Sequence, residues 1–285
     1  MTIALATVFA APGAVTGYAA IAVAALMVGL WLASIALRDV SIVDPAWGPA
    51  FVLVAAVAAA AGAGCLGRRW LLFGMTAVWG LRLGAYLLVR KLRDPGEDRR
   101  YAAMRERRGS RFVAWSLVWI FGLQGLLVLI VSLPVQVAAG RGGVLTAAII
   151  PGVVLWAVGF AFESIGDEQL RRFKARADNR GQVMDRGLWR YTRHPNYFGD
   201  FCVWWGLWLV ALTAGGTWWT FLGPVVMSTL LIRVSGAGLL EKDIGDRRPG
   251  YADYVRRTSG FFPWPPKKSP PTSKNGGHED SGSQP

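Results

Sequence analysis

The chain has 285 residues, of which 53% are hydrophobic and only 17% are charged, yet its formal net charge is +13. Soluble domains carry about 25% charged residues, so this composition excludes an ordinary soluble enzyme. It also excludes a nucleic-acid-binding protein, whose basic residues would lie on a water-soluble fold. The composition instead predicts a polytopic membrane protein with basic loops, in contact with the lipid bilayer.

Seven stretches of the sequence are apolar over nearly the length needed to cross a hydrocarbon core, which is about 20 residues. Their runs of Leu, Val, Ala and Trp lack the alternation of membrane β-strands. Because a backbone in lipid must satisfy its polar groups internally, we expect an all-α fold with about seven transmembrane helices. The stretches lie at 14–37, 46–64, 70–90, 112–133, 144–162, 197–213 and 216–234.

The basic residues predict how these helices are oriented. Of the 31 Lys and Arg residues, 26 lie in three segments, which are 90–111, 163–196 and the chain from Arg233 onward. Cytoplasmic loops are enriched in Lys and Arg, and seven spans bring all three segments to the same side. We therefore expect the N-terminus outside and the C-terminus in the cytoplasm.

The chain is expected to form one transmembrane domain over residues 1–262, followed by a polar tail over 263–285. The tail is rich in Pro, Ser and Gly and is expected to be disordered. Cysteines and histidines are too few and too scattered for a metal site, and no CxxC motif is present. We therefore expect no bound metal.

The polar segment 163–200 contains the residues expected to bind a ligand. Glu163 and Asp167 are four residues apart and share one helix face. Pro195 disfavours helix at the preceding residue, so the chain must turn just before the sixth span. The turn brings together Arg193, His194, Asn196, Tyr197 and Asp200.

This set of side chains suits an anionic ligand with polar rings. Guanidinium groups bind phosphates or carboxylates, whereas an amide and a carboxylate bind ribose hydroxyls or an exocyclic amine. The alternative is that the Arg and His residues simply face lipid phosphates at the membrane surface.

Ionisable residues near or within the apolar stretches are further candidates. Arg82 lies inside the third stretch, and intramembrane charges usually mark a functional site, although an arginine here could also extend to the interface. Asp44 could belong to the site or could form a solvated pair with Arg38. Gln124 could line a pocket or could join two helices by a hydrogen bond. After the last stretch, residues around Glu241 are expected to form short amphipathic helices that cover the site.

The segment NRGQVMDRGLWRYTRHPNYFGD (179–200), preceded by FESIGDEQLRRFK (162–174), resembles the C-terminal domain of the steroid 5-alpha-reductases. The similarity is closer to the bacterial relatives of these enzymes, which are often grouped as a domain of unknown function. It extends over nearly the whole chain, through DPAWG (44–48), WGLRLG (79–84), GEDRRYAAMRER (96–107), LQG (123–125) and RRPGYADYVRRTSGFFPW (247–264).

This resemblance implies a seven-helix reductase that binds NADPH from the cytoplasmic side of the bacterial inner (plasma) membrane. Such an enzyme reduces a carbon–carbon double bond conjugated to a ketone in a steroid-like or other lipid substrate. Compared with the steroid enzymes, Glu163 replaces an asparagine and Asp200 replaces a glutamate. The resemblance implies that the cofactor is bound by Asp167, Asn196 and Asp200, with Tyr197 in the same motif and Glu163 and Glu241 at matching positions. The chemistry of the polar segment adds Arg193 and His194 to the expected cofactor-binding residues.

The steroid enzymes polarise the substrate ketone with an N-terminal Gln or Glu and a tyrosine on the third helix. This chain has DPAWG and Trp79 in roughly those places. The expected catalytic residues near the ketone oxygen are therefore local substitutes, namely Asp44, Arg82 and Tyr86.

Two other functions remain open. Membrane methyltransferases of the isoprenylcysteine or phospholipid type also place an Arg-His-Pro-x-Tyr block before a membrane helix, but they bind S-adenosylmethionine. The acidic helix before the block favours the reductase. A non-catalytic membrane module or transporter would need a polar path through the bilayer, whereas the ionisable residues gather on one side.

Overall fold

The computed structural model describes residues 12–234 and 250–267, and all the regular elements in them are helical. These ranges contain no strand, only an isolated bridge between Thr192 and Ser259, so the all-α prediction is confirmed. The α-helices are α2 (Pro12–Leu37), α3 (Val43–Ala61), α4 (Leu66–Arg93), α5 (Arg99–Arg108), α6 (Phe112–Ser116), α7 (Leu123–Val131), α8 (Leu133–Ala139), α9 (Ile150–Ala175), α10 (Pro195–Leu212), α11 (Leu222–Thr229) and α13 (Tyr251–Arg257).

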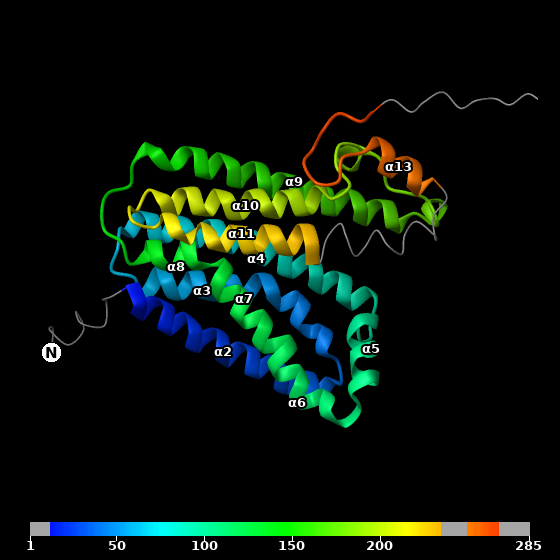
Figure 1. Ribbon diagram of the computed structural model, residues 1–285, viewed down its shortest axis with the longest axis horizontal. Coiled ribbons are helices and arrows are strands. Elements are labelled where there is room, and N and C mark those ends of the chain that lie inside the picture. The colour runs from blue at the N-terminus through cyan, green and yellow to red at the C-terminus, as the bar shows by residue number, and fades with distance from the viewer. Residues whose placement is uncertain (1–11, 235–249, 268–285) are drawn as a thin grey trace, which may run out of the picture.

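The long helices run side by side, and α5 crosses one end of the bundle, steeply inclined to them (Figure 1). A π-helical stretch, Leu117–Gly122, joins α6 to α7, and a second one, Leu230–Val234, extends α11. The segment that contains α13 lies over the same end of the bundle as α5, beyond the start of α10 (Figure 1).

The helices identify an integral membrane protein. Among the described residues, five helical stretches are long and apolar enough to cross a bilayer, and they contain most of each of the first five predicted spans. The sixth predicted span corresponds to α10, which has 18 residues and begins with polar side chains. The seventh corresponds to α11 and its π-helical extension. The count of seven and the orientation stay predictions. The five stretches are Gly13–Leu37, Val40–Ala61, Leu66–Arg93, Arg99–Val131 and Ala147–Ala175.

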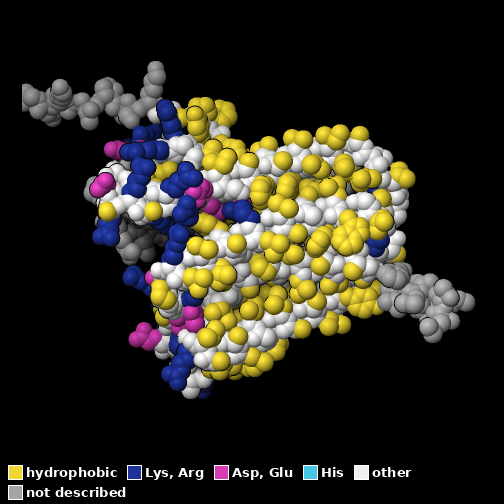
Figure 2. Space-filling model, turned by 180° about the vertical axis from the view of Figure 1, so that it is seen from behind, with side chains coloured by type: hydrophobic (Ala, Val, Ile, Leu, Met, Phe, Trp, Pro, Cys, Tyr) yellow, Lys and Arg dark blue, Asp and Glu magenta, His cyan; other side chains and the backbone are white. Residues whose placement is uncertain are grey.

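Charge is concentrated at one end of the bundle, whereas the flanks of the visible face are largely apolar (Figure 2). Large apolar side chains such as Ile21, Val118 and Trp119 are more than half exposed. A soluble monomer rarely exposes an apolar surface of this extent, but lipid would cover it. The charged end carries α5 and the C-terminal end of α9, so two of the basic segments meet there.

Glycines allow two pairs of helices to pack backbone against backbone. A Cβ atom on Gly199 of α10 would lie 2.5 Å from the backbone nitrogen of Glu163 and 2.6 Å from the carbonyl oxygen of Gly159, both on α9. Gly48 of α3 and Gly80 of α4 are in equally close contact. Small residues at such contacts are typical of membrane helix packing. They bring the side chains that flank the glycines close to the neighbouring helix.

The two glycine-packed pairs meet at a buried aromatic cluster. Phe51 of α3, Trp79 of α4 and Trp204 of α10 are completely buried, with ring centroids 4.6 to 5.6 Å apart. Edge-to-face and tilted contacts of this kind add to the energy of burial. The cluster fixes the spacing between the two pairs directly beneath the polar residues described below.

The ordered chain continues beyond the predicted domain boundary at residue 262. The backbone nitrogen of Trp264 donates to the carbonyl oxygen of Tyr191 at 3.0 Å, and that of Lys267 donates to Arg257 at 2.9 Å. The prediction of disorder from residue 263 is therefore wrong for residues 263–267, because these backbone bonds hold them against the domain. Residues 268–285 lie outside the described part.

Candidate functional site

A cavity of about 620 Å³ lies at the charged end of the bundle, between the α3/α4 pair and the α9/α10 pair. Its volume is within the range of small-molecule sites. It brings together residues that are far apart in the sequence, from Asp44 to Tyr254. The candidate site residues that line it are Asp44, Tyr86, Glu163, Asp167, Arg193, His194, Asn196, Tyr197 and Asp200.

The innermost part of the site is a buried ionic cluster between α4 and α9. Glu163 and Asp167 are each only 3% exposed and lie one turn apart on α9, as their spacing predicts. One terminal nitrogen of the Arg82 guanidinium donates to Asp167 at 2.8 Å, and the other donates to Glu163. The indole nitrogen of Trp79 also donates to Glu163, at 2.8 Å. Both carboxylates are thus held by α4.

The guanidinium of Arg82 contacts carboxylates in this geometry. One terminal nitrogen donates to Asp167 and the other donates to Glu163, and Arg82 is not among the residues that line the cavity. Arg82 thereby holds two carboxylates that do line the cavity. The expected contact between Arg82 and a substrate oxygen stays a prediction.

The start of α10 supplies the polar groups on the opposite wall. His194 precedes the first turn of α10, and its ring stacks on Tyr197 with centroids 5.4 Å apart. The side-chain nitrogen of Asn196 donates to Asp167 at 3.2 Å, which links α10 to the ionic cluster. Pro195 occupies the first helical position, where its missing N–H is tolerated, so the turn follows from the sequence.

Two buried acceptors on α10 have no partner within residues 12–234 and 250–267. They are the side-chain oxygen of Asn196 and one carboxylate oxygen of Asp200, whose residue is 8% exposed. Buried polar atoms are nearly always hydrogen-bonded, so these acceptors beside the cavity are available to water or to a ligand that donates hydrogen bonds. An exocyclic amide or a sugar hydroxyl is such a donor.

Four cations line the cavity. They are Arg90 of α4, Arg100 of α5, Lys174 of α9 and Arg193, which precedes α10. Arg100 contacts Asp44 at 3.4 Å and Asp98 at 3.0 Å. One terminal nitrogen of Arg193 donates to the carbonyl oxygens of Val255 and Thr258, so part of its hydrogen-bonding capacity holds the C-terminal segment in place. Such a set of cations suits phosphate groups.

Asp44 belongs to this site and not to a solvated pair with Arg38. It lines the cavity, and the hydroxyl of Tyr101 on α5 donates to it at 2.9 Å. Gln124 of α7 also lines the cavity. Apolar side chains complete the lining, among them Trp47, Leu83, Leu127, Met227 and Leu231.

Part of the C-terminal segment lines the site, whereas the expected cover around Glu241 stays a prediction. Tyr251 and Tyr254 on α13 line the cavity, and the hydroxyl of Tyr254 donates to the carbonyl oxygen of Trp189 at 2.6 Å. The indole nitrogen of Trp189 donates in turn to Gly166 on α9 at 3.0 Å. Glu241, the remaining candidate, lies outside the described residues.

The sequence does not predict several residues of the site. Trp79 stands out only as a departure from the steroid enzymes, and Arg90 and Arg100 contribute only to the predicted topology. The spacing of Arg82, Tyr86 and Arg90 on α4 is a signal that could have found Arg90, because residues four apart lie on one helix face. No sequence signal connects Trp79 to Glu163. In the described ranges, no group of three or more His, Cys, Asp or Glu residues is placed to hold a metal ion.

The chain matches the model of one protein family over residues 30–258, which is most of its length. That family is described as DUF1295, a protein of unknown function, and the chain belongs to it. The family is associated with steroid 5-alpha-reductase-like proteins. No curated protein and no solved structure matches the chain.

Proposed function

We propose that this DUF1295 protein is a membrane-embedded, NADPH-dependent reductase of a carbon–carbon double bond conjugated to a ketone in a lipid. One observation carries the proposal: a single cavity is lined by four cations, by a buried carboxylate–amide cluster and by apolar side chains. The cations and the carboxylate–amide cluster suit a dinucleotide, and the apolar side chains suit a lipid substrate. The sequence similarity of 162–200 to the steroid 5-alpha-reductases supports the same assignment, since this segment forms the polar wall.

The residues present fit the chemistry of the cofactor. Arg90, Arg100, Lys174 and Arg193 would hold its phosphates, because guanidinium and ammonium groups bind phosphate oxygens. The unpartnered oxygens of Asn196 and Asp200 would accept from ribose hydroxyls or from the carboxamide. When bound, NADPH would supply a hydride to the substrate.

The protein would hold and polarise the substrate. Tyr86 lies one turn from Arg82 on α4 and lines the cavity, so its hydroxyl is the donor that we assign to the ketone oxygen. A single donor to a developing oxyanion typically contributes about 3–4 kcal/mol to the transition state. The apolar walls around Leu127 and Met227 would exclude water and hold the lipid.

The proposal also includes the number of membrane spans and their orientation. Seven spans with the N-terminus outside would place the cationic part of the cavity in the cytoplasm, where NADPH is available, in the bacterial inner membrane. Membership of the steroid 5-alpha-reductase superfamily is part of the same proposal.

A methyltransferase is the second candidate, and one observation favours it. Glu163, Asp167 and Asp200 are three buried carboxyl groups, and within residues 12–234 and 250–267 one guanidinium, that of Arg82, forms ion pairs with two of them, Glu163 and Asp167. The sulfonium of S-adenosylmethionine would add a positive charge there. S-adenosylmethionine has no phosphate, however, and would leave the cations that line the cavity without a ligand, so NADPH is the better fit.

Ligand binding to the purified protein in detergent distinguishes these functions. NADPH should raise the melting temperature and quench tryptophan fluorescence, since Trp47 and Trp189 line the cavity, and S-adenosylmethionine should do neither. Asn196→Ala should weaken NADPH binding about tenfold, the effect of losing one good hydrogen bond. The matched control is Asn179→Ala, which also loses one hydrogen bond from its side-chain nitrogen but lies outside the cavity.

The possible results lead to different conclusions. Stabilisation by S-adenosylmethionine alone would replace the reductase with the methyltransferase. Binding of neither ligand would reject both enzymes. If NADPH binds, its oxidation by a long-chain enone in mixed micelles tests the reaction itself.

A further inference from the structure

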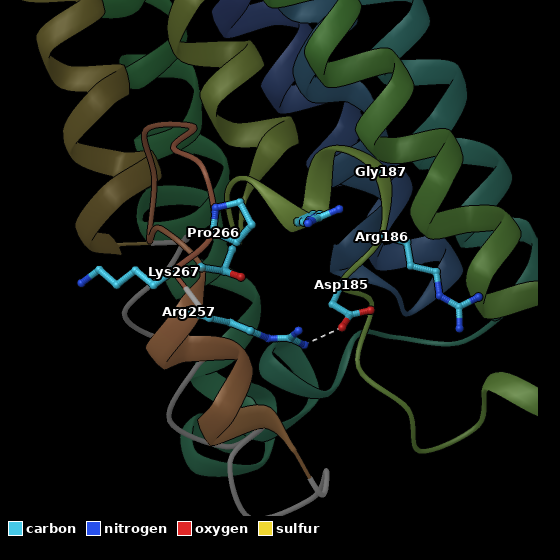
Figure 3. A pocket seen from close by; sticks show the side chains of 8 residues that line it. Asp185, Arg186, Gly187, Arg257, Pro266 and Lys267 are labelled. Carbon is cyan, nitrogen blue, oxygen red and sulfur yellow. Dashed lines mark hydrogen bonds and ion pairs between the residues drawn. The ribbon is translucent and has the colours of Figure 1, made fainter. Parts of the chain in front are cut away.

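A second pocket, separate from the cavity above, lies on the other side of the 185–190 loop. Its volume is about 430 Å³, and it is formed where this loop meets the C-terminal segment 257–267. Figure 3 shows Arg257 joined to Asp185, while Arg186 and Lys267 extend to opposite sides. The pocket shares no lining residue with the larger cavity, so it can bind a different molecule.

The pocket is strongly basic. Arg186, Arg190, Arg257 and Lys267 line it, and Asp185 is the one acidic residue among its lining side chains. Asp185 pairs with Arg257 at 2.5 Å, which leaves three positive charges in excess. The Nε atom of Arg257 is buried and has no acceptor in the described part of the chain. Because the side chains of Arg186, Arg190 and Lys267 are exposed, they can turn toward an anion without movement of the backbone.

Exposed aromatic residues adjoin this basic pocket. Trp264 is 70% exposed and Phe262 is 56% exposed, only a few residues before Lys267. The ring of Phe262 contacts Phe201 of α10 at 5.7 Å between centroids, so this segment lies against a helix of the bundle at its charged end. Aromatic and basic side chains next to each other are typical of the membrane interface, where the rings lie at the level of the headgroups.

We propose that this pocket binds the phosphate of an anionic membrane lipid, with Phe262 and Trp264 in contact with its glycerol and upper acyl region. Charge complementarity selects the phosphate, and the exposed aromatic rings select a ligand with an apolar part. The proposal is independent of the reductase function, because none of these residues lines the larger cavity.

The test compares lipid binding by two double variants with the same loss of charge. Purified protein in mixed micelles is titrated with phosphatidylglycerol or phosphatidylcholine, and bound lipid is counted by native mass spectrometry. The wild type should prefer phosphatidylglycerol. Arg186→Gln with Arg190→Gln should weaken its binding about tenfold, whereas Arg99→Gln with Arg107→Gln on α5 should change it less than about twofold. Equal melting temperatures in phosphatidylcholine verify that both variants fold.

Two further measurements distinguish a lipid ligand from free inorganic phosphate. Trp264→Ala should weaken phosphatidylglycerol binding about threefold, and inorganic phosphate at an equal phosphate concentration should not displace the lipid. If both double variants lost the same affinity for phosphatidylglycerol, the proposal would be overturned, because the lipid would then be attracted to basic residues in general. Displacement by inorganic phosphate would overturn it by showing a free-phosphate site, and so would equal binding of the two lipids.

Discussion

The indole nitrogen of Trp79 donates a hydrogen bond of 2.8 Å to Glu163, a residue 84 positions away on another helix. Trp79 is completely buried, and Glu163 is 3% exposed, so neither group can turn to water instead. This bond and the ion pairs of Arg82 link α4 to α9 through polar groups. Loss of a buried partner costs the full desolvation of the group that remains, about 1–3 kcal/mol.

We therefore expect Trp79→Phe to destabilise the protein by about 1–3 kcal/mol while keeping the aromatic packing against Phe51 and Trp204. Thermal unfolding in detergent, followed by circular dichroism, measures the change. Trp119→Phe is the control, because Trp119 is 58% exposed on the apolar flank. Equal melting temperatures for Trp79→Phe and the wild type would contradict the role of this bond.

Gly199→Ala should disrupt the site through the contact between α9 and α10. The added methyl group would lie 2.5 Å from the backbone of Glu163, and neither helix backbone can yield without separation of the pair. We expect a loss of several kcal/mol, or failure to fold, since overpacking a close contact costs about 1–3 kcal/mol or more. Gly74→Ala on α4 is the matched control, because a Cβ atom there meets nothing within 4 Å. The control should be neutral or slightly stabilising.

Tyr86→Phe tests the donor that we assign to the substrate ketone. If the protein is the proposed reductase, removal of this hydroxyl should lower kcat about 100-fold or more and leave NADPH binding unchanged. Steady-state reduction of an enone and a separate NADPH titration give the two quantities. Tyr18→Phe on α2 is the control, because Tyr18 is 42% exposed and does not line the cavity. An unchanged kcat in Tyr86→Phe would assign the donor to another residue.

Glu97 should make stability depend on acidic pH. Burial opposes its charge and would raise its pKa, but hydrogen bonds from the guanidinium of Arg105 and the backbone nitrogen of Val40 outweigh this effect. The pKa of Glu97 therefore lies below its ordinary value of 4.5. The ionised Glu97 stabilises the folded protein fully when the pH is above the ordinary pKa. This stabilisation is lost as the pH falls through the lowered pKa of the folded protein.

Glu97→Gln should accordingly lower the melting temperature at neutral pH, by an amount that corresponds to about 1–2 kcal/mol. The difference from the wild type should shrink below about pH 4. Glu106→Gln, an exposed position on α5, controls for the loss of one negative charge. A difference that stays constant down to acidic pH would mean that ionisation of Glu97 contributes nothing.

The sequence predicts the local features of this protein and misses the contacts between distant elements. The apolar runs predict the helices, Pro195 predicts the turn, and a four-residue spacing places Glu163 beside Asp167. Nothing local connects Trp79 to Glu163 or Tyr101 to Asp44, because these pairs depend on which helices pack together. Arg82 shows the same limit: an intramembrane arginine indicates a site, but only the fold shows that its guanidinium contacts Glu163 and Asp167.

The glycine contacts constrain some walls of the cavity more than others. Because α3 and α4, like α9 and α10, touch through backbone atoms at these contacts, each pair has few side chains that could rearrange there. The bonds from Trp79 and Arg82 to α9 and the buried rings of Phe51, Trp79 and Trp204 also join the two pairs to each other. The α11 segment, whose Met227 and Leu231 line the cavity, belongs to neither pair. It is the wall of the cavity that these glycine contacts do not hold.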